Sequence, residues 1–249
     1  MTALITGGTS GIGKALGIEL SKRGYELLLI SKNKNDFAEI EKGISTKATF
    51  LSFDLSKKEE CERLLEETKD KDIDLFINNA GFGDIGFFQK TSIEKEVNMV
   101  YLNDVATLIL VKGFLIRFCE KNKGRILITA SAASFGVAPY MNVYYATKAF
   151  VYSLAHGYYR ELKDKKSSVT ISVLCPGPVK TRFEEKGNMV FHFKTYSADR
   201  IAAYTIPRFL KGKLEIVPGL KMKFAHVFSH LTPKVLISKF LNKQAEIKK

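Results

Sequence analysis

Residues 2–13 read TALITGGTSGIG, and this stretch is the most informative part of the sequence about the fold. Its first part, Thr2–Thr6, is a short apolar run that ends at glycines, which is typical of a buried strand. Gly7, Gly11 and Gly13 then permit a tight turn, the close approach of a phosphate group and close packing of a helix on a strand. The helical pattern that follows starts with backbone N–H groups that favour an anion. The stretch therefore predicts a strand, a phosphate-binding turn and a helix, which together open a βαβ unit; a glycine-rich surface turn is the alternative.

The remainder of the chain repeats the alternation of strand and helix. Further apolar runs lie at Tyr25–Ser31, Lys47–Phe53, Ile73–Asn78, Arg125–Ala130, Val169–Cys175 and Leu214–Val217. Helical patterns lie at 11–23, 34–43, 56–70, 92–121, 142–164 and 198–210. Strands rich in Ile, Val and Leu that alternate with helices indicate a parallel sheet covered on both faces. We expect residues 1–249 to form a single α/β domain, a doubly wound sheet of about seven strands.

Composition excludes several classes of protein. The 249 residues are 45% hydrophobic and 26% charged, which excludes a disordered chain. No run of about 18 uninterrupted apolar residues predicts a membrane span, and the N-terminus does not resemble a secretory signal, so we expect a cytoplasmic protein. Cys61, Cys119 and Cys175 are far apart and show no metal-binding or redox spacing. We expect them to be buried thiols in a reducing compartment.

The formal net charge of +13 is concentrated at the C-terminus, where residues 211–249 hold nine lysines and two glutamates. The tail, 220–249, predicts two short helices, because Thr232-Pro233 is typical of an N-cap followed by proline in the first turn. Three interpretations of the lysines stay open. They are a solvated helix face, a weak contact with an anionic membrane surface, and nucleic-acid binding. Since no nucleic-acid motif accompanies the charge, we expect no nucleic-acid partner.

Several motifs together resemble the short-chain dehydrogenase/reductase family. The glycine spacing Gly7-x3-Gly11-x-Gly13 is similar to the TGxxxGxG motif of that family, Asn78-Asn79-Ala80-Gly81 to its NNAG motif, and Pro176-Gly177-Pro178-Val179 to its PG motif. The resemblance covers roughly residues 2–217 and implies a Rossmann fold that binds a nicotinamide dinucleotide. The residues that it implies for cofactor binding are Gly7, Thr9, Ser10, Gly11, Ile12, Gly13, Asp54, Leu55, Asn79, Ala80, Gly81, Tyr144, Lys148, Pro176, Gly177, Val179 and Thr181.

The end of the second strand bears on the choice of dinucleotide. An acidic residue there, about 20 residues after the glycine turn, selects NAD through the ribose hydroxyls. This chain has Ser31-Lys32-Asn33 and no acid until Asp36. Lys32 would attract a 2′-phosphate, and one charge-assisted hydrogen bond gives roughly a 10- to 150-fold preference. We predict NADP(H), with NAD(H) as the second choice and a solvated loop lysine as the alternative role of Lys32.

The catalytic residues are predicted from a combination of spacings. Tyr144 and Lys148 lie four residues apart, on one face of a helix. A Y-x3-K pair is common by chance, but Ser131 precedes Tyr144 by 13 residues, and this interval matches the family. Asn103, in a mostly apolar helix, matches the fourth polar position. Tyr145 is the nearest competitor, and choosing it breaks both the lysine and the serine spacing.

The chemistry requires these residue types. A hydride moves between the nicotinamide and a carbonyl carbon, and the oxygen must exchange a proton. The resemblance makes Tyr144 the acid or base. Its ordinary pKa is about 10, and we expect the Lys148 ammonium to lower it. Lys148 would also bind the nicotinamide ribose, Ser131 the substrate oxygen, and Asn103 a water that relays protons.

Residues 176–197 have no clear periodicity, and the resemblance identifies them as a lid over the substrate. The aromatic and apolar residues of this lid and of the expected pocket wall predict a bulky apolar carbonyl substrate. They are Phe183, Met189, Phe191, Phe193 and Tyr196 in the lid, and Phe82, Phe87, Phe135, Tyr140 and Met141 in the wall. The alternative is that these side chains only pack on the core. A lipid-related substrate is a weaker suggestion, which rests on a resemblance of the tail pattern Gly219, Lys223, Leu231 and Pro233 to a branch of the family that includes lipid-related reductases.

We therefore predict an NADP(H)-dependent oxidoreductase that acts on a carbonyl/alcohol pair, as a reductase. A non-catalytic dinucleotide sensor or scaffold is the alternative. The resemblance implies a homodimer or homotetramer through helices 92–121 and 142–164. No metal is expected, because His226 and His230 lack a third ligand and the H-E-x-x-H pattern.

Overall fold

A central seven-stranded parallel sheet organises the computed structural model, which describes residues 1–33, 37–180, 189–191, 195–242 and 245–247. The strand order is β10-β6-β5-β4-β1-β2-β3, and every pairing is parallel. The strands are β1 (Thr2–Thr6), β2 (Glu26–Ser31), β3 (Ala48–Ser52), β4 (Leu75–Asn78), β5 (Arg125–Thr129), β6 (Thr170–Leu174) and β10 (Glu215–Ile216). The predicted single-domain, doubly wound Rossmann fold is thus confirmed.

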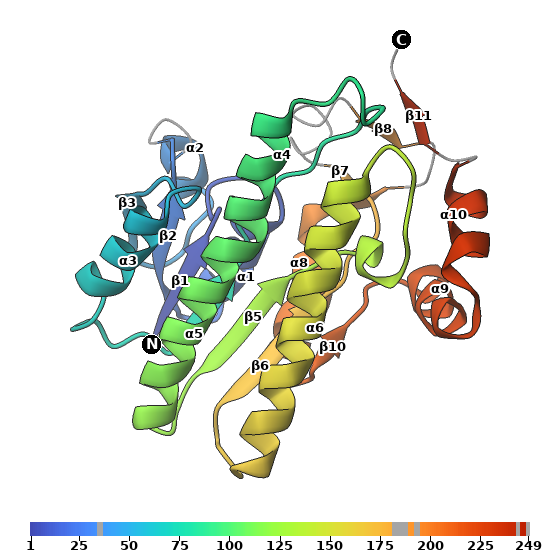
Figure 1. Ribbon diagram of the computed structural model, residues 1–249. Helices are drawn as coiled ribbons and strands as arrows, with labels where there is room; N and C mark the ends of the chain where they lie inside the picture. Colours follow the sequence, from blue (N-terminus) through green and yellow to red (C-terminus); the bar gives the residue numbers. More distant parts are fainter. Residues whose placement is uncertain (34–36, 181–188, 192–194, 243–244, 248–249) are drawn as a thin grey trace.

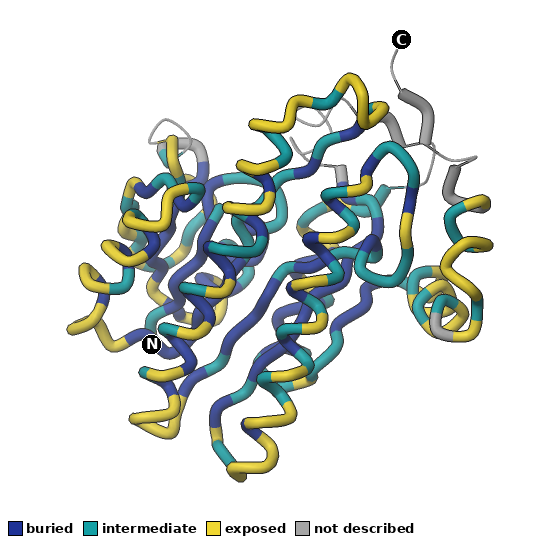
Figure 2. The backbone as a smooth tube through the Cα atoms, in the orientation of Figure 1, coloured by how far each residue is buried: buried dark blue, intermediate teal, exposed yellow. Residues whose placement is uncertain are grey.

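Helices cover both faces of the sheet (Figure 1). Those that follow the strands are α1 (Gly11–Ser21), α2 (Phe37–Glu41), α3 (Lys58–Glu67), α4 (Ile93–Val100), α5 (Ala106–Glu120), α6 (Asn142–Asp164) and α8 (Ala198–Leu210). Within β1, Ala3 and Ile5 pack with α1 and α8, whereas Leu4 packs with α3, α5 and α6. Both sides of each central strand are therefore buried (Figure 2), which is why these segments read as continuous apolar runs.

The order of the strands places the site. The chain builds β1, β2 and β3 toward one edge and then returns to add β4 beside β1. In open α/β sheets a ligand binds where the order reverses, beyond the carboxyl ends of the strands. The turn after β1 and the NNAG segment after β4 meet at that point.

Helices α4 and α5 join through a π-helical turn, η2 (Tyr101–Val105), into one continuous helix. By length and composition alone, Ile93–Glu120 is apolar enough to cross a membrane. However, Leu110, Val111 and Phe114 are completely or almost completely buried in the cluster that packs on the sheet. The core of the domain thus accounts for the apolar residues on the side of the helix that packs on the sheet.

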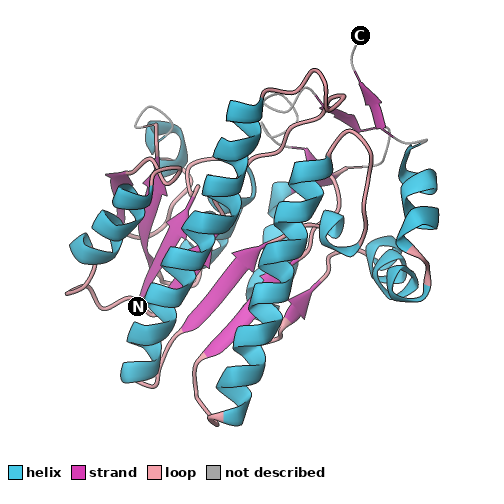
Figure 3. Cartoon of the chain, in the orientation of Figure 1, coloured by secondary structure: helices cyan, strands magenta, loops and turns pink. Residues whose placement is uncertain are grey.

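The C-terminal region forms two helices, α9 (Leu220–Leu231) and α10 (Lys234–Asn242), as predicted (Figure 3). Helix α10 begins at Lys234, one residue later than expected, so Pro233 precedes it and Thr232 ends α9, where its hydroxyl donates to the carbonyl of Phe228. Four short strands were not predicted. They are β7 (Val179–Lys180), which pairs with β9 (Tyr196–Ser197), and β8 (Met189–Phe191), which pairs antiparallel with β11 (Ala245–Ile247).

The three cysteines do not share one environment. Cys61 and Cys175 are buried, as expected, but Cys119 is exposed near the end of α5. The expectation was wrong for Cys119 because apolar periodicity identifies a helix as buried without fixing which of its last residues reach solvent.

Candidate active site

The glycine-rich turn has the geometry that its sequence predicts. Gly7 and Gly11 have φ angles of 61° and 52°, which favour glycine. A Cβ on Gly13 would lie 2.2 Å from the carbonyl oxygen of Gly7, so any side chain there would clash with backbone. Helix α1 begins at Gly11, and the side chain of Ser10 makes no capping hydrogen bond to it. Among the described residues, no side chain accepts a hydrogen bond from the first N–H groups of α1, as a phosphate site requires.

Asn79 ties the central strands together, the role that the resemblance implied. Its amide Nδ2 donates to the carbonyls of Thr6 and Gly7 at 3.2 and 3.3 Å, and its Oδ1 accepts from the hydroxyl of Thr129 at 3.2 Å. The hydroxyl of Thr6 accepts from the backbone N–H groups of Asn79 and Ala80. These bonds hold the ends of β1, β4 and β5 in fixed positions around the switch point.

Lys32 lies just beyond the end of β2, with its side chain 70% exposed. Its ammonium is 2.8 Å from Oδ2 of Asp54, and Asp54 also accepts hydrogen bonds from Ser56. Burial alone would raise the pKa of Asp54, but the bonds from Lys32 and Ser56 outweigh it and lower the pKa. Two residues predicted to read the adenosine end of a dinucleotide thus lie in direct contact.

Tyr144 and Ser131 lie close together beyond the carboxyl end of β5. Tyr144 lies in the first turn of α6 and is 9% exposed, while Ser131 follows β5 and caps the 3₁₀ helix η3 (Ala132–Phe135) by accepting from the N–H of Ala133. Burial raises the pKa of Tyr144 to about 12, and a hydrogen bond from Ser131 opposes that rise. The predicted lowering of this pKa by Lys148 is thus not observed, because loss of hydration outweighs every favourable interaction of the phenolate.

Lys148 lies one turn after Tyr144 on α6, with its Nζ 5.8 Å from the centre of the Tyr144 ring. The ammonium donates to the carbonyl of Thr129 at 3.2 Å. The side chain is almost completely buried, and burial lowers the pKa of Lys148 to about 8, against an opposing effect of the nearby Asp104 carboxyl. A buried lysine beside a phenol is an arrangement that can hold or pass a proton.

Asn103 lies in the π-helical turn and is 1% exposed. Its Nδ2 donates to the carbonyl of Phe82 at 2.9 Å and to the hydroxyl of Thr147 at 3.0 Å, and its Oδ1 accepts from the N–H of Phe82. The amide therefore fixes the loop after NNAG against α6. A Cβ on Gly81 would lie 2.8 Å from Oδ1 of Asn103, so glycine permits this close approach.

Asp104, which the sequence analysis missed, follows Asn103 in the same turn. Its Oδ1 is buried without a hydrogen-bond partner among the residues that the structure describes. Burial raises the pKa of Asp104 to about 7, and the Lys148 ammonium opposes the rise. An acid in the middle of an apolar helix could have signalled this, because buried carboxyls shift their pKa toward the neutral form.

An apolar cluster surrounds Tyr144. It contains Ile85, Met99, Ala133 and Met141, with Phe82, Tyr140, Val143 and Tyr145 packed against it. Phe87 contacts Tyr140, with ring centres 4.7 Å apart. Four of the predicted wall residues, Phe82, Phe87, Tyr140 and Met141, are therefore near the tyrosine. Phe135 is not among them, since its ring stacks on His226 instead.

The later part of the predicted site is described only in part. Pro176 and Gly177 are buried, and the carbonyl of Pro176 accepts from the N–H of Ala132 at 2.8 Å, which links the PG segment to η3. Thr181 lies outside the described residues, as do the predicted lid residues Phe183 and Phe193. No cluster of potential metal ligands occurs among the residues that the structure does describe.

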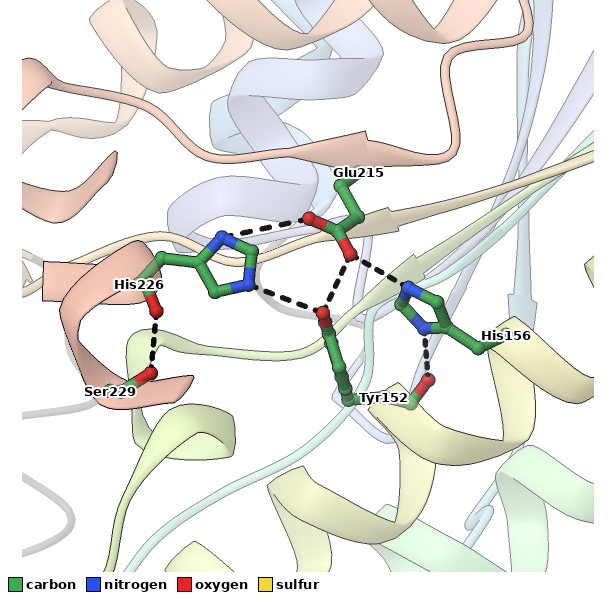
Figure 4. A network of polar contacts seen from close by, with 5 residues as sticks. All are labelled: Tyr152, His156, Glu215, His226 and Ser229. Carbon is green, nitrogen blue, oxygen red and sulfur yellow. Dashed lines mark hydrogen bonds and ion pairs between the residues drawn. The ribbon is translucent and has the colours of Figure 1, made fainter. Parts of the chain in front are cut away.

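A second polar network, also unpredicted, joins α6, β10 and α9 (Figure 4). Oε1 of Glu215 accepts from the hydroxyl of Tyr152 at 2.6 Å and lies 2.7 Å from Nε2 of His156. His226 lies 3.3 Å from the Tyr152 hydroxyl and 3.6 Å from Oε2 of Glu215. The carbonyl of His226 accepts from the Ser229 hydroxyl. Tyr152 and His226 are separated by 74 positions, so no local spacing could reveal the network.

Known proteins resemble the chain in sequence and in fold. A family model described as short chain dehydrogenase matches residues 1–189. A diacetyl reductase [(S)-acetoin forming] of Staphylococcus epidermidis is 30% identical over 191 residues, which is 74% of each chain. Two solved structures have the same fold at 24% identity. A short-chain dehydrogenase of Sphingobium yanoikuyae in complex with NADPH has a TM-score of 0.83, covering 92% of this chain and 93% of the other. A bulky-bulky ketone specific alcohol dehydrogenase of Comamonas testosteroni has a TM-score of 0.77, covering 92% of each chain.

The matched segment contains the glycine turn, the NNAG and PG segments and the residues Ser131, Tyr144 and Lys148. It spans three quarters of the chain, far beyond a single motif. This chain belongs to the short-chain dehydrogenase/reductase family of oxidoreductases.

Proposed function

We propose that the protein is an NADP(H)-dependent reductase of bulky apolar ketones or aldehydes. The observation that carries the proposal is the convergence of Ser131, Tyr144 and Lys148 at the carboxyl edge of the sheet. Ser131 hydrogen-bonds Tyr144, and the Lys148 ammonium lies 5.8 Å from the ring of Tyr144. A structural scaffold has no need of a buried phenol, hydroxyl and ammonium at the switch point, so we favour catalysis over the sensing alternative.

The residues present fit a nicotinamide dinucleotide. Glycine at 13 permits the close approach of α1 to the turn after β1, glycine at 81 permits that of Asn103, and α1 offers its first N–H groups to a pyrophosphate. We propose that Asp54 and Leu55 contact the adenine and that Asn79 and Ala80 contact the ribose. When bound, the reduced nicotinamide supplies the hydride. We propose that Lys148 binds its ribose hydroxyls and holds the cofactor in place.

The roles of the reacting side chains follow from their chemistry. Tyr144 gives its hydroxyl proton to the carbonyl oxygen as the alcohol forms, while Ser131 donates a hydrogen bond to the same oxygen. Lys148 stabilises the resulting phenolate and restores its proton. Asn103 holds the backbone of Phe82 and the hydroxyl of Thr147 in position, and we propose that this arrangement keeps a water within reach of Lys148.

The preference for NADP(H) rests on Lys32. The lysine lies at the end of β2, where a carboxylate would repel the 2′-phosphate. Its side chain is largely exposed and is held by Asp54, so it can turn to a phosphate without loss of a buried contact. The NADPH complex of a family structure is consistent with this choice.

The substrate class rests on the apolar cluster around Tyr144. Phe82, Tyr140 and Met141 offer ring and thioether surface and few hydrogen-bonding groups, which favours a substrate with a large apolar body. One solved structure of the same fold is a bulky-bulky ketone specific alcohol dehydrogenase, whereas one 30% identical relative is a diacetyl reductase. A panel from small diketones to long-chain and lipid-derived ketones separates these possibilities.

Replacing the tyrosine tests the proposal. Tyr144→Phe removes the transferable proton and leaves the ring, so NADPH should bind normally while turnover falls by roughly 10²–10⁴-fold. Calorimetric titration measures binding, and NADPH oxidation with the carbonyl panel measures turnover. Tyr145→Phe is the matched control, because Tyr145 lies beside Tyr144 on α6 and its pKa is also raised by burial. A Tyr144→Phe enzyme as active as Tyr145→Phe would refute the assignment.

A further inference from the structure

Helix α9 faces the protein with one apolar and two polar side chains. Met222, His226 and Ser229 are half-buried on the inner face, and His226 stacks on Phe135 with ring centres 4.1 Å apart. The other five large apolar residues of the helix face outward and are between 62% and 80% exposed. They are Leu220, Phe224, Val227, Phe228 and Leu231. A surface helix of a soluble protein normally buries its apolar stripe. The stripe of α9 is instead exposed, without a packing partner among the residues that the structure describes.

Lysines border the apolar stripe on both sides. At the helical period of 3.6 residues, Lys221 and Lys223 lie about 80° to either side of the centre of the stripe. The surface continues onto α10, where Val235 and Leu236 are 67% and 54% exposed and Lys239 is exposed. Figure 2 shows both helices at one edge of the molecule with mostly exposed positions.

The charge of this region has one sign. Residues 216–245 contain no aspartate or glutamate. A cavity between α8 and the start of α9 adds Arg200 to the cationic border and is also lined by Lys223. An apolar stripe flanked by cations matches the chemistry of an anionic bilayer, whose headgroups take the lysines and whose acyl region takes the Phe and Leu side chains. A second copy of the same surface would bring lysines against lysines.

We propose that α9 and α10 form a docking surface for an anionic lipid bilayer. The docking surface comprises the outward apolar residues of α9 and α10 and their flanking lysines. It would lie in the plane of the membrane interface and would not span the membrane. This proposal is independent of the proposed reductase activity.

The docking surface lies next to the active site. Phe135, on which His226 stacks, belongs to η3, the helix that Ser131 caps. A Cβ on Gly177 would lie 2.8 Å from Sδ of Met222, so the PG segment also contacts α9 closely. A docked bilayer would therefore lie on the outer side of a helix whose inner side contacts η3 and the PG segment.

Sedimentation with vesicles tests the docking surface directly. The full chain is mixed with vesicles of phosphatidylcholine alone or with added phosphatidylglycerol, without cofactor or substrate, at low and at high salt. We expect binding to the anionic vesicles that weakens with salt. Lys221→Glu with Lys223→Glu should weaken it by roughly 25-fold, about fivefold for each lysine. Phe224→Ser with Phe228→Ser should weaken it by at least about tenfold.

Matched variants control for exposure and charge. Phe88→Ser replaces a phenylalanine that is 74% exposed, against 75% for Phe224, and should bind normally. Lys71→Glu with Lys165→Glu changes the net charge equally in the loops before β4 and β6, away from α9 and α10, and its loss of vesicle binding should be smaller. Thermal unfolding confirms that each variant is folded.

Three outcomes would overturn the proposal. They are the absence of binding to anionic vesicles, equal binding to neutral vesicles at all salt concentrations, and equal effects of the docking-surface and control variants. A dimer in vesicle-free solution that Phe224→Ser dissociates would assign the surface to self-association instead. Because no turnover is measured, an inactive enzyme that binds vesicles would refute only the reductase function.

Discussion

Burial moves the pKa values of Tyr144 and Lys148 in opposite directions and favours the neutral form of each. The pKa of Tyr144 rises to about 12 and that of Lys148 falls to about 8. A phenol that keeps its proton at neutral pH is prepared to act as an acid, which is the role required for carbonyl reduction. In alcohol oxidation Tyr144 would have to act as a base, which requires the phenolate and therefore a lower pKa. The positive charge of the bound oxidised cofactor would have to assist this lowering of the pKa.

A single substitution at the end of β2 should change the choice of cofactor. Lys32→Asp replaces the predicted phosphate contact with a carboxylate beside Asp54, so two negative charges would face a 2′-phosphate. We expect the NADPH preference to fall by roughly 10- to 150-fold, with NADH binding retained. The ratio of kcat/KM for the two cofactors measures it. Lys32→Gln is a control that removes charge without reversing it, and full NADPH preference in Lys32→Asp would contradict the role of Lys32.

The buried carboxyl of Asp104, whose Oδ1 has no hydrogen-bond partner among the described residues, should weaken the fold at neutral pH. Its pKa is raised to about 7, so the native state holds a proton that the unfolded chain, with an ordinary carboxyl pKa, releases. Stability therefore falls as the pH rises from the unfolded pKa to the native one. Asp104→Asn keeps the shape without the charge, and we expect it to be about 1–3 kcal/mol more stable than the wild type at pH 8. Urea unfolding measures the difference, which should shrink at pH 5.

Asp74→Asn is a control for which we expect the opposite effect on stability. Burial alone would raise the pKa of Asp74, but bonds from Lys123 and the N–H of Thr2 lower it. Its contribution is present above the unfolded pKa and is lost as the pH falls through the native one. Asp74→Asn should thus destabilise the protein at pH 8. The same sign for both substitutions would contradict the electrostatic account.

Sequence patterns predicted the bounds of those strands and helices that depend on local residues alone. The strand Thr2–Thr6 and the helices Asn142–Asp164 and Ala198–Leu210 begin and end where their patterns do, because apolar runs and helical periodicity are local properties. The convergence of Ser131 and Tyr144 was predicted from a family interval. The role of Asp104 and the contacts of Glu215 were not, since they depend on which side chains the folded sheet brings together.

The network around Glu215 should hold α9 on the domain. Burial alone would raise the pKa of Glu215, but hydrogen bonds from Tyr152 and His156 outweigh it, so the pKa is lowered and the carboxylate is charged at neutral pH. Glu215→Gln weakens the bonds to Tyr152 and His226. We expect amide hydrogen exchange in 220–231 to quicken by about tenfold at pH 7, corresponding to a charged hydrogen bond of about 1.5 kcal/mol, with α5 unchanged. Glu62→Gln, in an exposed ion pair with Lys58, is the control. Unchanged exchange would mean that packing on Phe135 alone holds α9.

At the scale of the whole molecule, the sequence showed where apolar and basic residues occur but not which way they face. Leu220 and Phe224 have the spacing of a buried helix stripe, and only the fold shows that this stripe points away from the sheet. The same holds for Ile93 and Val97 on α4, which are 74% and 45% exposed. Which face of a helix is buried depends on tertiary packing, so the pattern of the helix alone does not determine it.

The molecule thus has two exposed apolar faces, and we predict that they have different partners. The face along α4 and α5 includes Val97 and Leu108, 45% and 39% exposed, and corresponds to the assembly surface that the family resemblance implied. A charge in its centre would remain unpaired on association, at a cost of several kcal/mol. Val97→Glu with Leu108→Glu should therefore convert a dimer or tetramer into monomers in sedimentation equilibrium. Leu231→Glu, on α9, should leave the assembly intact. The prediction fails if the wild-type chain is monomeric, or if Leu231→Glu alone dissociates it, since α9 would then be the surface that joins the subunits.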